Sequence, residues 1–271
     1  MPGSLFPPET AREQESPSIR VGPERGTIIA VGGGNRPDIL AKFIEAAGGF
    51  DAAIVYVPTA GLTPPGEPRL TRSDGDSTET TFRTAGAKNV VVLHTFDRAM
   101  ANSASFVEPI TRAGGVWFSG GRPERLTNTY AGTRTEREIR GVLDRGGVVG
   151  GTSAGAVVLG SDFVSNSMSE IPPEDRPSQP GFGFLRAVAV QPHTRRAEPR
   201  SWTLKRPDLL GIAMDETTGW IVRGDLAEIA GTGNAYVFDH NANRPGENFI
   251  TLRVGDSYNL ATRVMRRVDS R

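Results

Sequence analysis

The pentapeptide Gly151-Thr152-Ser153-Ala154-Gly155 is the strongest chemical signal in the sequence. It follows a short apolar run and precedes a helical run over 156–159, the strand–turn–helix setting in which Gly-x-Ser-x-Gly marks a nucleophilic serine. Ser153 would lie in a tight, strained turn with its hydroxyl lifted clear of the sheet. The N–H of Ala154 would then point to where an oxyanion forms. The alternative is a glycine-rich turn in which the serine only caps a helix.

A serine nucleophile needs a general base, and the chain offers three histidines, His94, His193 and His240. His94 ends a predicted strand and His240 follows one, so each is typical of an edge or surface residue. His193 follows the apolar run 187–190 at a strand's carboxyl end, where catalytic groups gather in α/β sheets. Its distance from the serine allows one crossover between adjacent strands. We predict His193 as the base, the alternative being a buried structural histidine.

An acid that fixes the imidazole tautomer would complete the site. Glu170 lies in the loop after the predicted nucleophile helix, and Glu216, with Asp215, ends the strand 211–214. Either carboxylate is within reach of His193 by this argument, and both are equally typical of solvated loop residues. The sequence leaves the choice between them open.

The composition restricts the class of protein that carries these residues. The chain has 271 residues, 31 basic against 31 acidic ones, and no cysteine. The balance of charge argues against broad capture of nucleic acid or anionic membrane. Without cysteine there is no disulfide framework, thiolate metal site or cysteine nucleophile. No apolar run approaches the length that spans a bilayer, so we expect a globular protein. The serine chemistry predicted above needs no metal or organic cofactor.

Residues 1–25 are rich in Pro, Glu, Ser and Arg and lack apolar periodicity, which predicts a mobile arm before a single α/β domain over 26–271. The arm has neither the basic nor the apolar region of a signal peptide. We therefore expect a cytoplasmic protein, with a processed secreted form as the alternative.

Short apolar strands alternate with helical patterns through the first half of the domain. A capping box at Thr133 and Glu136 predicts a helix that runs to about Asp144, and Asn35 and Pro37 begin another that ends before Gly48. Uniformly apolar strands between helices indicate a parallel sheet covered on both faces. The predicted strands are 28–31, 53–57, 89–93, 115–118 and 147–150.

The pattern changes after residue 210 to closely spaced β runs at 210–214, 219–223, 227–231, 235–238 and 248–253. These runs predict an antiparallel extension of the same sheet or a flanking hairpin layer. The glycine- and proline-rich stretches 60–76 and 171–183 are typical of surface loops beside strand ends.

Taken together, these motifs resemble peptidase family S51, which contains cyanophycinase and aspartyl dipeptidase, with cyanophycinase the more similar branch. The resemblance runs from about Gly26 to Asp239. Five motifs carry it: Val31 to Gly34, Ser-Gly-Gly-x-x-x-Arg-Leu at 119–126, Gly-Thr-Ser-Ala-Gly-Ala at 151–156, His193, and Leu-Gly-Ile-Ala-Met-Asp-Glu at 210–216.

Membership would imply a flavodoxin-like three-layer sandwich related to class I glutamine amidotransferases, usually homodimeric. It would imply hydrolysis next to aspartate, and in the cyanophycinase branch exopeptidase release of β-Asp-Arg dipeptides from the aspartate–arginine polymer. By position, Ser153 and His193 match the family's nucleophile and base. The backbone amides of Gly121 and Ala154 match its oxyanion hole. Two acidic residues of the family correspond to Glu170 and Glu216.

The sequence departs from cyanophycinases in two substrate-facing motifs. Where they carry Gly-Gly-Asp-Gln, this chain has Gly120-Gly121-Arg122-Pro123, and Pro123 has no side-chain amide with which to hold a substrate. The arginines after the histidine also differ in spacing, although such residues can still bind a carboxylate through paired hydrogen bonds. They are Arg195, Arg196 and Arg200. Serine hydrolase chemistry on an aspartate-containing peptide thus fits better than a strict preference for cyanophycin.

Two other functions compete with this hypothesis. The turn Gly32-Gly33-Gly34 suggests a dinucleotide-binding enzyme, but Pro37 stands near where the third glycine belongs, and the second strand ends in Val57-Pro58 without the expected acid. A non-catalytic binding protein or pseudo-enzyme would explain Pro123 and the rearranged arginines, but the intact serine motif opposes it.

Overall fold

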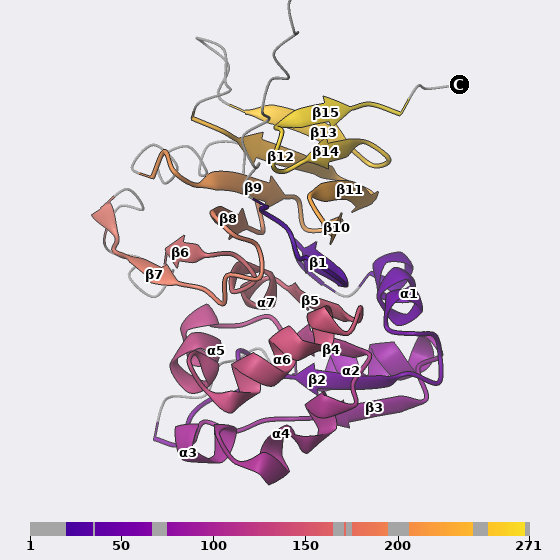
Figure 1. The fold of residues 1–271 in the computed structure, drawn as a ribbon, viewed down its shortest axis with the longest axis vertical. Coiled ribbons are helices and arrows are strands. Elements are labelled where there is room, and N and C mark those ends of the chain that lie inside the picture. The colour runs from indigo at the N-terminus through magenta and orange to yellow at the C-terminus, as the bar shows by residue number, and fades with distance from the viewer. Residues whose placement is uncertain are drawn as a thin grey trace, which may run out of the picture.

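A computed structural model describes residues 20–34, 36–66, 75–164, 171, 175–194, 206–240 and 249–268, with 75–78 described by backbone alone. Within these residues nine strands form one sheet, in the order β15-β14-β11-β10-β1-β5-β4-β2-β3 (Figure 1). Their bounds are β1 Thr27–Val31, β2 Ala53–Val57, β3 Asn89–Val92, β4 Gly115–Phe118, β5 Val148–Thr152, β10 Thr218–Arg223, β11 Leu226–Gly231, β14 Ser257–Asn259 and β15 Val264–Arg266.

The half of this sheet from β1 to β3 is parallel, and the half from β1 to β15 is antiparallel. Parallel strands need crossovers, and helices supply them. The helices are α1 Pro37–Ala46, α2 Gly75–Thr84, α3 Arg98–Ala101, α4 Ala104–Thr111, α5 Pro123–Tyr130, α6 Arg134–Asp144 and α7 Ala154–Val157. The predicted strands in the first half of the chain are all present, β5 running two residues further than expected.

Helices cover both faces of the parallel half because its strands are apolar on both faces. Ile29 and Val31 of β1 pack in one buried cluster with α1 and α2. Ile28 and Ala30, which point the other way, belong to a second cluster formed with α4, α5, α6 and α7. The result is the expected mixed α/β three-layer arrangement.

A second sheet of six strands packs on the side of α7, in the order β13-β12-β9-β8-β6-β7 (Figure 1). Its strands are β6 Asp162–Val164, β7 Ser178–Pro180, β8 Val188–Gln191, β9 Leu210–Met214, β12 Asn234–Phe238 and β13 Ile250–Arg253. The pairs β6–β8 and β8–β9 are parallel, whereas β9, β12 and β13 pair antiparallel.

Three sequence-based expectations need correction. The closely spaced β runs do not all extend one sheet, because β10 and β11 join the large sheet while β9, β12 and β13 join the small one. The sequence also predicted that the strands preceding Ser153 and His193 are adjacent, but β5 belongs to the large sheet and β8 to the small one. β7 also occupies part of the segment 171–183, which the sequence predicts to be a loop.

The expected capping box at the start of α6 is not formed. Thr133 is the N-cap residue, but its hydroxyl donates to the carbonyl of Tyr130 at 2.6 Å. Glu136 instead accepts from the N–H of Gly132 at 2.7 Å. Thr133 is fully buried, and its hydroxyl bond to Tyr130 closes the turn before α6 in place of a side-chain cap on the helix.

The described part of the predicted arm, residues 20–25, contacts both sheets. The N–H groups of Val21 and Gly22 donate to Asp225 Oδ1, in the turn between β10 and β11, at 2.8 and 2.9 Å. The carbonyl of Val21 accepts from the N–H of Arg186, just before β8, at 2.7 Å. Val21 itself is 5% exposed, so this segment bridges the large and small sheets.

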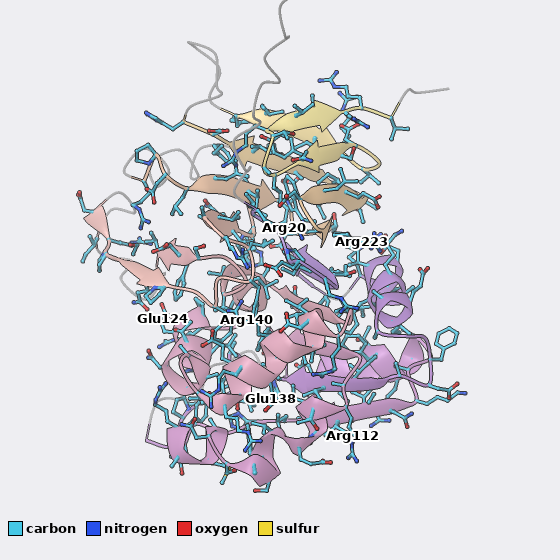
Figure 2. All side chains as sticks on the ribbon, viewed as in Figure 1. Arg20, Arg112, Glu124, Glu138, Arg140 and Arg223 are labelled. Atoms are coloured by element: carbon cyan, nitrogen blue, oxygen red, sulfur yellow. The ribbon has the colours of Figure 1, made fainter. Side chains whose placement is uncertain are left out.

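Arg140 on α6 connects the helix layer to the segment that leads into β8 (Figure 2). Its Nη2 donates to the carbonyl of Phe182 at 2.7 Å, and its guanidinium lies 4.8 Å from the ring centre of Phe184. Such a cation over an aromatic face is favourable even at a partly exposed site.

No helix of the described residues is long and apolar enough to cross a membrane.

Candidate active site

Ser153 stands at a sharp turn between β5 and α7. Its backbone has φ 53° and ψ −119°, a conformation that L-residues rarely adopt. The turn is compact because glycine flanks it: a Cβ on Gly151 would lie 2.5 Å from the carbonyl carbon of Gly155, and one on Gly155 would lie 2.4 Å from the oxygen of Phe118. Strain held in place by close packing is typical of a functional position.

The hydroxyl of Ser153 does not cap α7. The backbone of that turn is satisfied in another way, because the carbonyl of Ser153 accepts from the N–H groups of Ala156 and Val157 at 2.9 and 3.0 Å. The hydroxyl instead lies 2.7 Å from Nε2 of His193. A serine used only as a helix cap would show the opposite arrangement.

His193 follows β8 in a left-handed backbone conformation, with φ 56°. Its other ring nitrogen, Nδ1, lies 2.7 Å from Oε1 of Glu216. A carboxylate accepts only, so Nδ1 carries the proton and Nε2 is free to accept from Ser153. The three side chains form one directed hydrogen-bond chain of the kind in which a carboxylate orients a histidine base.

The turn between β9 and β10 positions Glu216. The carbonyl of Glu216 accepts from the N–H of Gly33 at 2.8 Å. The preceding Asp215 anchors the same turn, since its carboxylate accepts from the N–H of Asn234 at 2.8 Å and from the hydroxyl of Tyr236 at 3.3 Å. Glu216, one of the two acids that the sequence left open, contacts His193, while Glu170 lies outside the described residues.

The glycine turn after β1 has a role that the sequence did not reveal. A Cβ on Gly33 would lie 1.9 Å from Oε2 of Glu216 and 2.8 Å from Cε1 of His193, and one on Gly32 would lie 2.0 Å from the carbonyl oxygen of Asp215. This turn therefore leaves room for the carboxylate and the imidazole, instead of forming a nucleotide fingerprint. The only signal in the sequence was the glycine run itself.

The loop after β4 brings Gly120 and Gly121 beside the serine. A Cβ on Gly120 would lie 3.3 Å from Cβ of Ser153. Gly121 has φ 136°, and a Cβ there would lie 2.1 Å from the carbonyl oxygen of Ala60. Within the part of the chain that the structure describes, the N–H groups of Gly121 and Ala154 have no hydrogen-bond acceptor, as expected for donors reserved for an oxyanion.

The remaining candidates from the sequence are four residues outside the described part of the chain and two further histidines. Glu170, Arg195, Arg196 and Arg200 are outside the described residues, so their roles stay predictions. His94 is hydrogen-bonded to a residue other than the serine, since its Nδ1 lies 2.9 Å from the hydroxyl of Thr59. Burial lowers the pKa of His94. His240 is an exposed residue after β12.

The site is open to water over the described residues. The side chains of His193 and Glu216 are 45% and 66% exposed. Solvent screening weakens the charge interaction between such groups, so orientation of the imidazole is the main effect that Glu216 can have here. Among the described residues there is also no cluster of three or more His, Asp or Glu that would hold a metal ion.

A mixed α/β fold that presents a serine on a strained turn, hydrogen-bonded to a histidine that is itself hydrogen-bonded to a glutamate, defines a hydrolase of the serine type. The family model for peptidase family S51 matches residues 28–229. Because this match spans most of the chain, the protein belongs to peptidase family S51.

Relatives agree with this assignment. The chain is 30% identical to the cyanophycinase of Geminocystis herdmanii (strain PCC 6308) over 230 residues, which cover 80% of this chain and 82% of that protein. It is 30% identical to the cyanophycinase of Synechococcus elongatus over 266 residues, covering 88% and 80%. A crystal structure of a peptidase from an acI-B1 Actinobacterium shares the fold, with a TM-score of 0.68, 23% identity, and coverage of 89% of this chain and 98% of that one.

Proposed function

We propose that this protein is a serine peptidase that hydrolyses aspartate-linked peptide bonds, in cyanophycin or in related aspartyl peptides, through an acyl-enzyme on Ser153. The observation that carries the proposal is the chain of two 2.7 Å contacts from Ser153 through His193 to Glu216. The substrate class comes from the cyanophycinases at 30% identity. The alternative of a non-catalytic binding protein gives no reason for a strained serine to be aligned on a histidine.

In the proposed reaction, Oγ of Ser153 attacks the scissile carbonyl while Nε2 of His193 takes its proton. The N–H groups of Gly121 and Ala154 donate to the oxyanion of the tetrahedral intermediate. The C–N bond then breaks, and His193 returns the proton to the leaving amine. Water, activated by His193, attacks the acyl-enzyme, and Ser153 regains its proton when the ester bond breaks.

Substrate binding is proposed to rest on arginine. Pro123 is buried at the first turn of α5 and offers the substrate no donor. Arg195, Arg196 and Arg200 are the candidates for binding a substrate carboxylate. Replacing Arg196 with alanine should then raise KM far more than it lowers kcat, and an unchanged KM for all three single variants would remove that role.

The first experiment compares the wild type with Ser153→Ala on cyanophycin and on a panel of short aspartyl peptides. Dipeptide products from cyanophycin, absent with the variant, would support the exopeptidase assignment. Cleavage of short peptides alone would restrict the substrate to aspartyl peptides. If no aspartyl substrate is cleaved although Ser153 reacts with a fluorophosphonate, the proposed substrate class is wrong. We also propose that the protein forms a homodimer, as the resemblance to family S51 implies, and light scattering on the same sample tests this.

A further inference from the structure

A hydrogen-bond chain of three buried residues and the half-buried His94 lies at the carboxyl ends of β2 and β3 and is not part of the Ser–His–Glu chain. The hydroxyl of Thr59, which is fully buried, lies 2.9 Å from Nδ1 of His94 and 2.7 Å from the hydroxyl of Tyr130. The N–H of Thr95 donates to that same Tyr130 hydroxyl at 3.3 Å. Buried polar groups of this kind are costly to leave unpaired, so the chain is built to be complete.

When His94 is neutral, its Nδ1 can accept a hydrogen bond from the hydroxyl of Thr59. The N–H of Thr95 donates to the hydroxyl of Tyr130, and that hydroxyl lies 2.7 Å from the hydroxyl of Thr59 and 3.3 Å from the carbonyl oxygen of Thr95. Burial lowers the pKa of His94, which favours this neutral form. The charged neighbours are occupied elsewhere: Asp97 caps α3, and Arg98 donates to the carbonyls of Asn128 and Ala131.

Thr59 belongs to the loop on which the Gly120–Gly121 turn rests. The next residue, Ala60, accepts from the N–H of Arg122 at 2.9 Å through its carbonyl. That carbonyl oxygen approaches Gly121 so closely that a Cβ at 121 would lie 2.1 Å from it. The guanidinium of Arg125, which is buried, donates to the carbonyl of Leu62 in the same loop. A shift of residues 59–61 would therefore move the amide of Gly121.

We propose that Thr59, His94 and Tyr130 are positioning residues that hold the loop 58–61, and through it the N–H of Gly121, in register with the oxyanion formed on Ser153. The inference rests on the proposed function, since it assigns these residues to the oxyanion step of that reaction. In this proposal the three residues act through Ala60 and the loop 58–61 and not by binding the substrate.

The test is Thr59→Val, which removes the hydroxyl and keeps the shape, with Thr135→Val as the matched control. Thr135 is also fully buried, and its hydroxyl donates to the carbonyl of Ala101 at 2.7 Å, on α6 and away from the loop. Both variants should lower the melting temperature. Only Thr59→Val should lower kcat, by about tenfold, a part of the 10²- to 10³-fold that one oxyanion donor contributes, with KM changed less than twofold.

The rate at which a fluorophosphonate labels Ser153 provides a readout that does not depend on the peptide substrate. It should fall with kcat in Thr59→Val and stay normal in Thr135→Val and Thr59→Ser, which keeps the hydroxyl. If Thr59→Val does not fold, Tyr130→Phe replaces it. Normal kcat and labelling in the chosen variant, or equal losses in the control, would overturn the inference. A wild type that does not label at all would instead remove the proposed function.

Discussion

At the residue scale, Glu216 orients the imidazole of His193 while remaining well exposed to solvent. Its Oε1 lies 2.7 Å from Nδ1, and its backbone is fixed by the N–H of Gly33. Glu216→Gln should lower kcat by about 10³-fold with little change in KM, because an amide can donate to Nδ1 and so hold the imidazole in the wrong tautomer. Steady-state kinetics on the substrate identified with the wild type measures this.

Glu170→Gln is the matched comparison for that variant. Since Glu216 already occupies the contact with Nδ1, Glu170→Gln should leave kcat within a few-fold of wild type. The reverse order of the two effects would transfer the orienting role to Glu170.

A second residue-scale prediction concerns Gly33. In Gly33→Ala the new methyl would meet Oε2 of Glu216 and the ring of His193, and the flexible carboxylate is the group that can move. We expect kcat to fall by about 10²- to 10³-fold, close to the cost of losing the carboxylate, while the fold remains.

Gly34→Ala controls for the backbone effect of adding a side chain. Gly34 has φ 63°, and no atom of the described residues lies within 4 Å of the position that a methyl would take. This variant should therefore cost about 1 kcal/mol of stability and little activity. Circular dichroism and kinetics on both variants separate the two outcomes. Similar kinetics for the pair would mean that Gly33 does not reserve space for the site.

The sequence predicted Ser153 and His193 by type and local setting, but it could not choose between Glu170 and Glu216. The choice depends on the parallel pairing of β8 with β9, in which Gln191 lies opposite Ala213, so that the residues just beyond both strands meet. Register between strands that are nearly 20 residues apart is a tertiary property, and no local pattern encodes it.

At the scale of elements, the strained serine depends on how closely α7 approaches β4. In Gly155→Ala the methyl would lie 2.4 Å from the carbonyl oxygen of Phe118, and a backbone atom cannot yield as a side chain does. We expect the free energy of unfolding to fall by about 2 kcal/mol or more, in the range of overpacked cores, together with loss of fluorophosphonate labelling.

The control for this prediction is Gly141→Ala, in the middle of α6. There the methyl would meet only the far end of Arg145, at 3.0 Å, among the described residues. Replacing glycine with alanine inside a helix should raise stability by about 0.5–1 kcal/mol without affecting labelling. Denaturant titration of the two variants gives the comparison, and equal stabilities would contradict it.

Strand positions were predictable because each β run is apolar and bounded by turn residues, but sheet membership was not. β9 and β10 follow each other closely and are both almost wholly buried, yet they belong to different sheets. A continuous apolar run does not indicate which face of the strand is buried, so it does not reveal the sheet to which the strand belongs. The two strands do not pair with each other but are joined by a side-chain hydrogen bond, in which Nε1 of Trp220 on β10 donates to the carbonyl of Ala213 on β9 at 3.1 Å. No sequence pattern indicates this contact.

At the scale of the whole molecule, each of the two sheets contributes residues to one site. The large sheet carries Ser153 after β5, and the small sheet carries His193 after β8. Glu216 stands where the chain passes from β9 in the small sheet to β10 in the large one. Because neither sheet alone holds the three side chains, packing between the sheets sets the distances on which the proposed reaction depends.

At high pH the stability of the whole molecule depends on Tyr258 of β14, which is fully buried in the main core cluster. Burial raises the pKa of its phenol to about 12, and its hydroxyl has no hydrogen-bond partner among the described residues. Since the unfolded phenol ionises near pH 10, stability should fall as pH rises from about 10 to 12. Tyr258→Phe should flatten that fall and add about 1 kcal/mol at neutral pH. Tyr236→Phe, which removes a hydroxyl bonded to Asp215, should instead destabilise; unfolding curves that match for both variants would contradict this.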